Sequence, residues 1–202
     1  FGVGYTRAMR EQTHRATEES VENTGRFTVD LTGISWLTVR GAFDHSNRNG
    51  NFDGMELFLG GGQQPSLRQF DISDRIKDRF SLMLVVTPVS WLSLNGTRSA
   101  GKEDYPATDA RTIFGLRSND TDAYSVGFDL TPIDKVSFDA NYGFDKFNTF
   151  QVSRTASPVT GVTDEQKLAS LNDPSQQYND PRRDWNLSNN DWSQSLDSSL
   201  NF

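Results

Sequence analysis

The stretch 136–145 reads VSFDANYGFD and decides the fold. An apolar side chain occupies every second position, and Ser, Asp, Asn or Gly fills the positions between. Successive side chains of a β-strand point to opposite faces, so this alternation predicts a strand with one apolar and one polar face. The stretch 124–131, YSVGFDLT, alternates in the same way. The residues Thr131-Pro132-Ile133-Asp134 between the two stretches predict a tight turn, because Pro presets φ.

The same unit occurs twice more upstream. Aligned on its threonine, the copies begin at Thr32, Thr87 and Thr131 and read TGISWLTV, TPVSWLSL and TPIDKVSF. The repeat predicts a series of hairpins, and half units at the two chain ends supply two further strands. Eight strands are predicted, at 1–10, 24–32, 36–46, 79–87, 91–99, 122–131, 135–147 and 190–202.

The predicted connections fall into two classes. Three are tight turns rich in Thr, Pro and Gly, whereas those at 11–23, 47–78, 100–121 and 148–189 are long and polar. Compact soluble domains rarely hold such long loops. Outer-membrane barrels have short turns on the periplasmic side and long loops outside. The predicted fold class is therefore all-β: an antiparallel up-and-down transmembrane β-barrel, or a segment of a larger one.

The chain begins inside a strand pattern and shows no secretory signal, so residues 1–202 are expected to be one barrel domain or barrel segment, incomplete at one or both ends. The closing residue, Phe202, fits either the aromatic end of a bacterial barrel's last strand or a position just before another turn. A water-soluble β-sandwich or barrel, with its apolar faces in an ordinary core, remains the alternative that alternation by itself would favour.

Composition removes several classes of function. The formal net charge of −7 argues against a general nucleic-acid binder, which needs a cationic surface. The chain has no cysteine, which excludes disulfides and thiolate metal sites, and no apolar run long enough for a transmembrane helix. Only 34% of residues are hydrophobic, but 11% are aromatic, and disordered chains are poor in aromatic residues. Barrel strands combine these properties because half of each strand is polar.

Strand parity then predicts which side chains face lipid. Charged residues such as Arg40, Asp129 and Asp139 fall on the polar parity, which avoids a cost of about 2–4 kcal/mol for Arg or Lys near the bilayer midplane and somewhat less for Asp. An interfacial girdle is expected from Trp36 and Trp91 beside the turns and from Trp192, with Trp185, at the other end. The residues expected to face lipid are Phe27, Val29, Leu31, Leu37, Val39, Phe43, Phe80, Leu82, Leu84, Val86, Leu92, Leu94, Tyr124, Val126, Phe128, Leu130, Val136, Phe138, Ala140, Tyr142 and Phe144.

No motif predicts an enzyme, and no catalytic, cofactor-binding or metal-binding residue is expected. Gly60-Gly61-Gly62 lacks the Lys-Ser/Thr ending of a phosphate loop. The pattern from Asp44 to Gly50 echoes a calcium loop, but Arg48 occupies a ligand position. Neither His14 nor His45 has a Ser and an Asp placed with it to suggest a triad.

Two charged stretches are expected to be structural. Asp71, Asp74 and Asp78 alternate with basic residues up to Arg79, which predicts a charged strand extension above the membrane. The segment 180–184, DPRRD, is expected to form a self-paired loop salt bridge of small energetic value.

Several elements of the chain resemble the MtrB/PioB family of outer-membrane barrels. They are Asp129-Leu130-Thr131-Pro132 running into Val136-Ser137-Phe138, Asn141-Tyr142 ending in Asp145-Lys146-Phe147, the stretch FDISDR at 70–75, and Asp184-Trp185 followed by Asn189-Asn190-Asp191. The resemblance implies a barrel of more than eight strands that sheathes a periplasmic multihaem c-type cytochrome and lets electrons cross the outer membrane. The chain has no Cys-x-x-Cys-His motif, so any haem is expected in the partner.

The inward-facing residues fit a wide lumen that holds water or a protein plug, because a narrow eight-stranded barrel fills its interior with its own side chains. Many of them are small: Ser81, Ser93, Ser125, Gly127, Ser137, Gly143, Ser195 and Ser199. The expected location is the outer membrane, with lipid and a multihaem cytochrome as partners. Two alternatives stay open: a solute-passing porin or TonB-dependent-receptor-type barrel, and a secreted or surface structural β protein.

Overall fold

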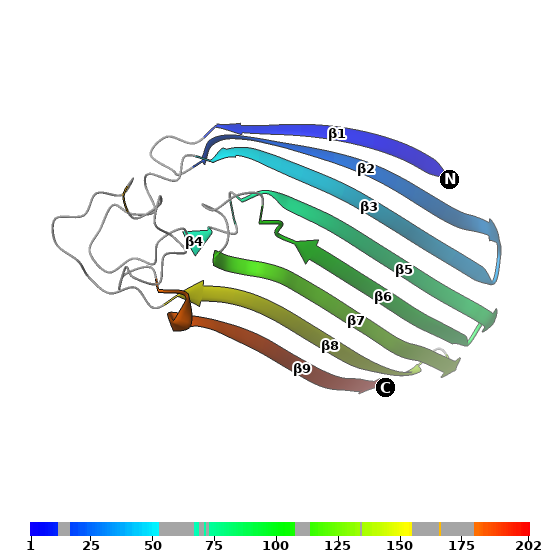
Figure 1. Ribbon diagram of the computed structural model, residues 1–202. Coiled ribbons are helices and arrows are strands. Elements are labelled where there is room, and N and C mark those ends of the chain that lie inside the picture. Colours follow the sequence, from blue (N-terminus) through cyan, green and yellow to red (C-terminus); the bar gives the residue numbers. More distant parts are fainter. Residues whose placement is uncertain are drawn as a thin grey trace.

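The computed structural model is a single antiparallel sheet of eight long strands, with a short ninth strand at one end (Figure 1). It describes residues 1–11, 17–52, 67–68, 71, 73–107, 114–133, 135–154, 166 and 180–202. The strands follow one another in chain order across the sheet, β1-β2-β3-β5-β6-β7-β8-β9. Within the described residues, no helix has the length and apolar character that a membrane span requires.

The long strands run up and down between two different ends of the molecule. Tight turns join them at one end, called here the turn end, and the strand ends between which the chain makes its long connections form the other, the loop end (Figure 1). The elements are β1 (Gly2–Glu11), β2 (Thr17–Ile34), β3 (Leu37–Phe52), β4 (Leu67–Arg68), β5 (Arg75–Val89), β6 (Leu92–Asp104), β7 (Phe114–Ile133), β8 (Val136–Arg154), the 3-10 turn η3 (Pro181–Arg183) and β9 (Asp184–Asn201). The short β4 pairs in parallel with the start of β7.

All eight predicted strands are present, but their predicted boundaries at the loop end are wrong. β7 starts at Phe114 rather than 122, β8 continues to Arg154 rather than 147, and β9 starts at Asp184 rather than 190. Parts of the segments predicted as loops are therefore strand. Backbone pairing continues into polar sequence there, where the apolar alternation that revealed the strands has already ended.

Strand register keeps all predicted apolar residues on one face. Leu31 pairs with Val39, Val39 with Leu84, Val126 with Tyr142, and Tyr142 with Leu196, so one row of apolar side chains crosses the sheet. We call the face that carries this row the apolar face. The opposite, polar face carries Asp30 paired with Arg40 and Ser125 paired with Gly143. A slip of one residue would exchange the two sets, so the register is strongly specified.

The three repeated turn units share one backbone irregularity. Register shifts occur between Leu31 and Ile34, between Val86 and Val89, and between Leu130 and Ile133. Each shift contains the Thr-Gly or Thr-Pro dipeptide of the repeat. Proline has no N–H to donate and is tolerated at such bulges. The repeated sequence therefore encodes a repeated bulge that ends each hairpin.

Neighbouring hairpins are joined at the same position of the repeat. The Thr87 N–H donates to the Trp36 carbonyl at 2.8 Å, and the Thr131 N–H donates to the Trp91 carbonyl at 2.9 Å. The threonine N–H of one unit thus donates a hydrogen bond to the tryptophan carbonyl of the unit before it. These bonds fix each hairpin against its predecessor.

The hairpins are also staggered. Leu37, the first residue after its turn, pairs with Val86, and β5 continues three residues further to Val89. Leu92 likewise pairs with Leu130, and β7 continues three residues further to Ile133. Because the bulge sets these three residues opposite two of the next strand, the stagger is two residues of about 3.3 Å over two strand spacings of about 4.8 Å, a tilt of about 35°. Barrel closure requires a tilt of this size.

The sheet itself is not closed. β1 pairs with β2 alone and β9 pairs with β8 alone among the strands that the structure describes. The outer backbone groups of these two edge strands are free for further pairing. The arrangement is consistent with a segment of a barrel.

Close strand approach makes one glycine sensitive to substitution. A Cβ on Gly127 would lie 2.9 Å from the Ala140 carbonyl oxygen and 2.8 Å from Asn141 Oδ1, whereas a Cβ on Gly25 meets nothing within 4 Å. We expect Gly127→Ala to destabilise the barrel by about 1–3 kcal/mol, because the carbonyl cannot move without disturbing the ladder. Gly25→Ala is expected to be neutral or stabilising by about 0.5–1 kcal/mol. Urea unfolding of the refolded full-length barrel in detergent measures both, and equal midpoints for the two variants would contradict the packing described.

Candidate functional site

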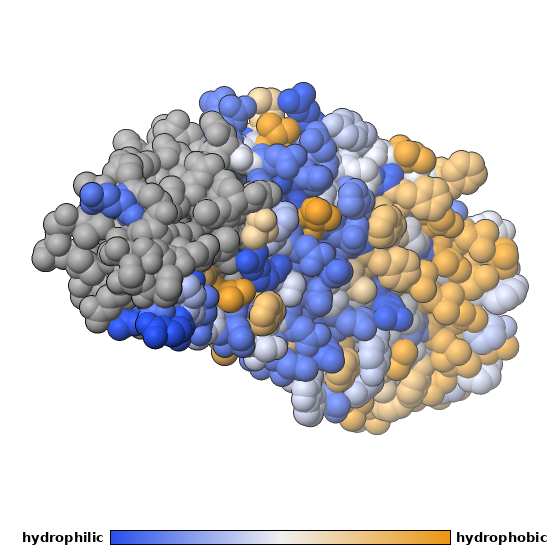
Figure 2. Space-filling view, viewed as in Figure 1, coloured by the Kyte–Doolittle hydropathy of each residue, from blue (hydrophilic) through white to orange (hydrophobic). Residues whose placement is uncertain are grey.

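The apolar face is open to its surroundings. Leu84 is 39% exposed and Val126 is 55% exposed. Tyr105 and Phe114 are the buried hydrophobic residues of the described part of the chain, and both lie at the loop end. A soluble β-sandwich would seal its apolar residues between two sheets. Figure 2 shows hydrophobic residues gathered toward the turn end, with hydrophilic residues predominating toward the loop end.

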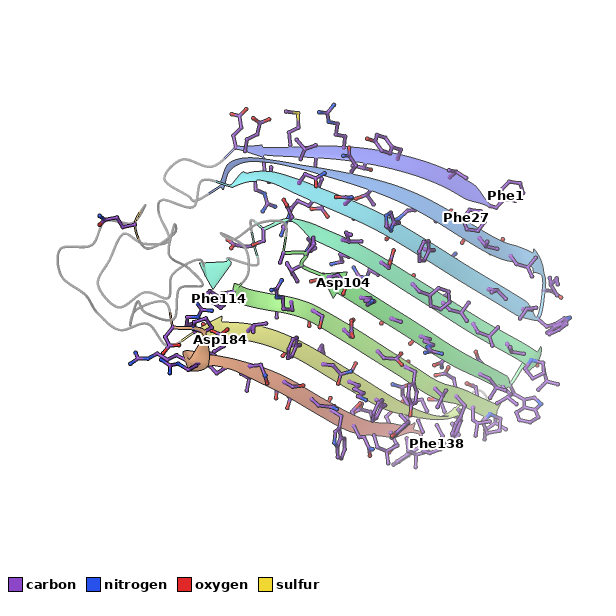
Figure 3. All side chains as sticks on the ribbon, viewed as in Figure 1. Phe1, Phe27, Asp104, Phe114, Phe138 and Asp184 are labelled. Carbon is purple, nitrogen blue, oxygen red and sulfur yellow. The ribbon has the colours of Figure 1, made fainter. Side chains whose placement is uncertain are left out.

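Every residue predicted to face lipid lies on this apolar face, because the register connects them row by row. Phe1 and Phe138 mark its half nearer the turn end in Figure 3. The face also carries charged residues beyond the apolar runs of the strands, and Arg98, Asp122 and Lys146 are the first of them on β6, β7 and β8. Arg98 and Asp122 form an ion pair at 3.3 Å.

The tryptophans lie at different heights of the sheet. Trp36 and Trp91 lie in the turns and are about half exposed, and Trp192 lies on the apolar face nearer the loop end. Trp185, predicted at the level of Trp192, pairs with Ser153 and lies on the polar face. The prediction failed because both residues belong to the one strand β9, where an odd separation places their side chains on opposite faces and at different heights.

Aromatic rings form a ladder across β7, β8 and β9 on the apolar face. The ring centroids of Tyr124 and Phe144 are 5.2 Å apart and nearly stacked, and those of Phe144 and Trp192 are 6.5 Å apart with an interplanar angle of 16°. Tyr142 lies 6.3 Å from Tyr124. Cross-strand aromatic pairs of this kind stabilise sheets. The ladder therefore supports the register where the sheet approaches its open edge.

The polar face is hollowed. A trough of about 600 Å³ extends from β2 to β9. Small side chains dominate its floor, among them Ala42, Ser81, Thr97, Ser99, Ser125, Gly143 and Ser195. The Thr97 and Ser125 hydroxyls share a hydrogen bond of 2.7 Å, and Ser199 donates to Asp139. These residues satisfy one another along the sheet and leave the space above them unfilled.

Charge on the polar face is unevenly divided. In β2 and β3, Arg26 forms a two-bond pair with Asp44 (2.5 and 2.7 Å), and Arg40 lies 3.5 Å from Asp30. The polar face of β8, β9 and the 119–133 part of β7 has no Lys or Arg among its described residues but five aspartates: Asp129, Asp139, Asp145, Asp191 and Asp197. Asp129 and Asp139 stand directly opposite each other across the strands. One wall of the trough is therefore acidic.

A partly buried ion network occupies the polar face at the loop end. Arg75 lies 2.8 Å from Glu22 and 3.6 Å from Glu103, and Lys77 lies 2.5 Å from Glu103. Tyr105 donates its hydroxyl to Glu103 at 2.9 Å. Burial and this hydrogen bond raise the pKa of Tyr105 to about 12, so the hydroxyl keeps its proton and remains a donor. Burial opposes ionisation of Glu103, but hydrogen bonds from Lys77 and Tyr105 outweigh it and lower the pKa of the carboxyl.

Arg48 holds the segment before β5 against the polar face. Its side chain is 6% exposed, and it donates to the Ser73 carbonyl at 2.8 Å and to the Asp71 carbonyl at 2.9 Å. Asp74 adds a carboxylate that accepts the Gly50 N–H at 2.8 Å. Arg48, which argued against a calcium loop in the sequence, thus holds the segment before β5 in place, and we call this set of contacts the Arg48 clamp. The sequence held one signal for this contact. Charged residues continue to alternate after the apolar residues end, both from Arg75 to Arg79 in β5 and along β3.

Other sequence predictions have mixed outcomes. Arg182 pairs with Asp180 at 2.8 Å as predicted, but Asp184 pairs with Arg154 at 2.5 Å, beside Phe114, because β8 and β9 extend to bring them together (Figure 3). His45 lies 2.7 Å from Asp78 and takes part in no larger cluster: across the described ranges, no group of three or more His, Cys, Asp or Glu residues is arranged to hold a metal. His14 and Gly60-Gly61-Gly62 lie outside the described residues.

The clamp predicts a local effect of substitution. In Arg48→Gln the charge-assisted bonds to the Ser73 and Asp71 carbonyls are lost, which we expect to favour local opening of this segment by about 2 kcal/mol, or roughly 30-fold faster amide exchange. Hydrogen exchange with mass spectrometry of the full-length barrel measures it. The exposed Arg26→Gln serves as the control and is expected to leave this segment unchanged. Equal exchange in all three proteins would show that Arg48 does not hold the segment.

Comparison with known proteins agrees with this geometry. The family model of the outer membrane beta-barrel porin MtrB/PioB matches residues 1–197, nearly the whole chain. No curated protein matches the chain. The staggered up-and-down strands, the open apolar face and the polar trough are the features that such a barrel wall requires. The chain belongs to the MtrB/PioB family of outer-membrane β-barrel porins.

Proposed function

We propose that this chain forms part of the wall of a large outer-membrane barrel that encloses a multihaem c-type cytochrome, so that electrons can cross the membrane. In this proposal the apolar face contacts lipid and the polar face lines the interior. The main observation that supports this proposal is the unfilled trough of about 600 Å³ over small polar side chains. It leaves space for an occupant that the sheet itself does not supply.

The open sheet edges support a barrel of more than eight strands. In hydrocarbon, every backbone N–H and C=O needs a partner, so β1 and β9 require neighbours on their free sides. If these eight strands closed on themselves, the interior would be only wide enough for its own side chains. Ser and Gly at the centre of the polar face would leave such an interior poorly filled. Further strands that widen the barrel satisfy both conditions.

The acidic wall indicates the chemistry of the occupant. Five aspartates without a basic neighbour on the same face of β7–β9 favour a cationic surface against them. The directly opposed Asp129 and Asp139 repel each other, and a positively charged partner relieves that cost. A cytochrome with basic residues around its exposed haem edges fits this wall. An aqueous pore for cations would share the same lining, and the second experiment below distinguishes the two.

Adjacent residues of β5 test which face contacts lipid. Leu84 lies on the apolar face, about midway along the apolar run of β5, and Met83 lies beside it in the trough. We expect Leu84→Arg to destabilise the barrel by about 2–4 kcal/mol, because the charge enters hydrocarbon, and Met83→Arg to change stability by less than about 1 kcal/mol. Urea unfolding in phospholipid vesicles provides the measurement. Equal destabilisation by both substitutions would contradict the assignment of the faces.

A second pair of variants tests the occupant. Replacing Ser81, Ser125 and Ser195 with Trp fills the trough, whereas replacing Leu82, Val126 and Leu196 with Trp places the same number of indole rings on the apolar face. We expect the full-length wild-type barrel and the apolar-face variant to co-purify with a haem-staining protein. The amount of that protein recovered with the trough variant is expected to be at least five-fold lower. Recovery of all three barrels free of haem, with ion conductance in planar bilayers, would instead establish a solute-passing porin.

A further inference from the structure

A groove of about 580 Å³ crosses β8 and β9 on the apolar face. It is lined by Phe144 and Lys146 of β8 and by Asn190, Trp192 and Gln194 of β9. The rings of Phe144 and Trp192 are nearly parallel, with centroids 6.5 Å apart, and Trp192 is 64% exposed. Neither the ion network at the loop end nor the trough on the polar face uses any of these residues.

Strand geometry places this groove at one rim of the apolar belt. The apolar run of β8 extends from Val136 to Phe144, nine residues. A barrel strand tilted by about 45° crosses the hydrocarbon core in roughly 9–11 residues. Lys146 therefore follows the span at the loop side, and Lys135 precedes it at the turn side. In outer-membrane barrels the loop side faces outward, so the groove lies at the level of the outer-leaflet headgroups.

The ammonium group of Lys146 has no counter-ion in the sheet. Asp122 stands opposite Lys146 in the register; its Oδ2 pairs with Arg98 at 3.3 Å, and its Oδ1 makes no hydrogen bond. Among the residues that the structure describes, no carboxylate lies within ion-pair distance of Lys146. A cation beside a tryptophan at a membrane rim is suited to the phosphate of a lipid headgroup.

The remaining lining residues favour a sugar-bearing headgroup. Asn190 and Gln194 flank Trp192 on the same face of β9, since each is two residues from it. Amide side chains both donate and accept hydrogen bonds, which matches the hydroxyl groups of a sugar. Trp192 lies one step deeper than Asn190, and Phe144 lies one step deeper again, level with Gln194, so the two rings offer parallel apolar surfaces to an acyl chain.

We propose that this rim groove is a binding site for a phosphorylated glycolipid of the outer leaflet. Lys146 binds a phosphate, Asn190 binds a sugar hydroxyl, and Phe144 and Trp192 pack against an acyl chain. The proposal rests on the proposed contact between the apolar face and lipid, and it is independent of what occupies the interior. The site would fix the barrel's height in the outer leaflet at this wall.

Native mass spectrometry of the full-length barrel in mild detergent tests the site, with diphosphoryl lipid A as the probe. We expect Lys146→Gln to weaken its binding at least ten-fold, because the phosphate loses its cation, and Trp192→Leu to weaken it by a smaller factor. Lys146→Arg is expected to preserve binding. Lys135→Gln removes the same charge at the opposite rim and is expected to bind lipid A as the wild type does.

Three results would overturn the proposal: unchanged binding in Lys146→Gln, equal binding of a lipid A analogue without phosphates, or equal, Lys146-dependent binding of phosphatidylglycerol, which would make the groove a phospholipid site. Failure here is separable from failure of the proposed lipid contact. If Leu84→Arg destabilises the barrel and Met83→Arg does not, the apolar face contacts lipid whatever the result at Lys146.

Discussion

Pairing of every backbone N–H and C=O, in a register that keeps all apolar side chains on one face, is the constraint on which this structure depends. A slip of one residue between two strands would turn an entire set of side chains to the wrong face. The repeat prevents it by ending each hairpin with a bulge at the same place and by joining Trp36 to Thr87 and Trp91 to Thr131. Bilayer hydrocarbon offers no water to replace a lost partner, so a register fixed by the backbone is also a condition for insertion.

The same strands pass through two environments and change their chemistry along the way. Near the turn end the apolar face carries the large side chains, and the polar face carries small ones. Near the loop end, Glu22, Arg75, Lys77 and Glu103 form a network where an ordinary domain would have a hydrophobic core. Breaking a buried pair leaves an uncompensated charge, so the loss of one member of this network is expected to destabilise the arrangement of the others. The Arg48 clamp uses the same chemistry to hold irregular backbone against the sheet.

Apolar alternation predicted the sheet well because each strand has an apolar face and a polar face, and successive side chains belong to opposite faces. The strands around Val126, Phe138 and Leu84, the three turns, and the parity of Arg40, Asp129 and Asp139 are all confirmed. The outer strand halves could not be predicted in the same way, since both faces of β7 from Ser118 to Asp122 are mainly polar. The clamp on Ser73 and the pairing of Arg154 with Asp184 join positions far apart in the chain. Such contacts follow from the register of the assembled sheet, which local pattern does not contain.

The β2–β3 part and the β7–β9 part of the polar face differ in charge because only the first pairs its acidic residues with basic ones. In β2 and β3, among the residues whose side chains the structure describes, each acidic residue of the polar face faces a basic one across the strands, as Arg26 faces Asp44 and Arg40 faces Asp30. On the polar face of β8, β9 and the 119–133 part of β7, the five aspartates have no basic residue opposite them, so the sheet leaves their charge in place. Separated carboxylates over a wide interior keep a negative field that reaches into it, and a low-dielectric wall concentrates that field. A barrel with one neutralised and one acidic wall would therefore orient a charged occupant, which distinguishes a sheath for a specific partner from a uniformly lined pore.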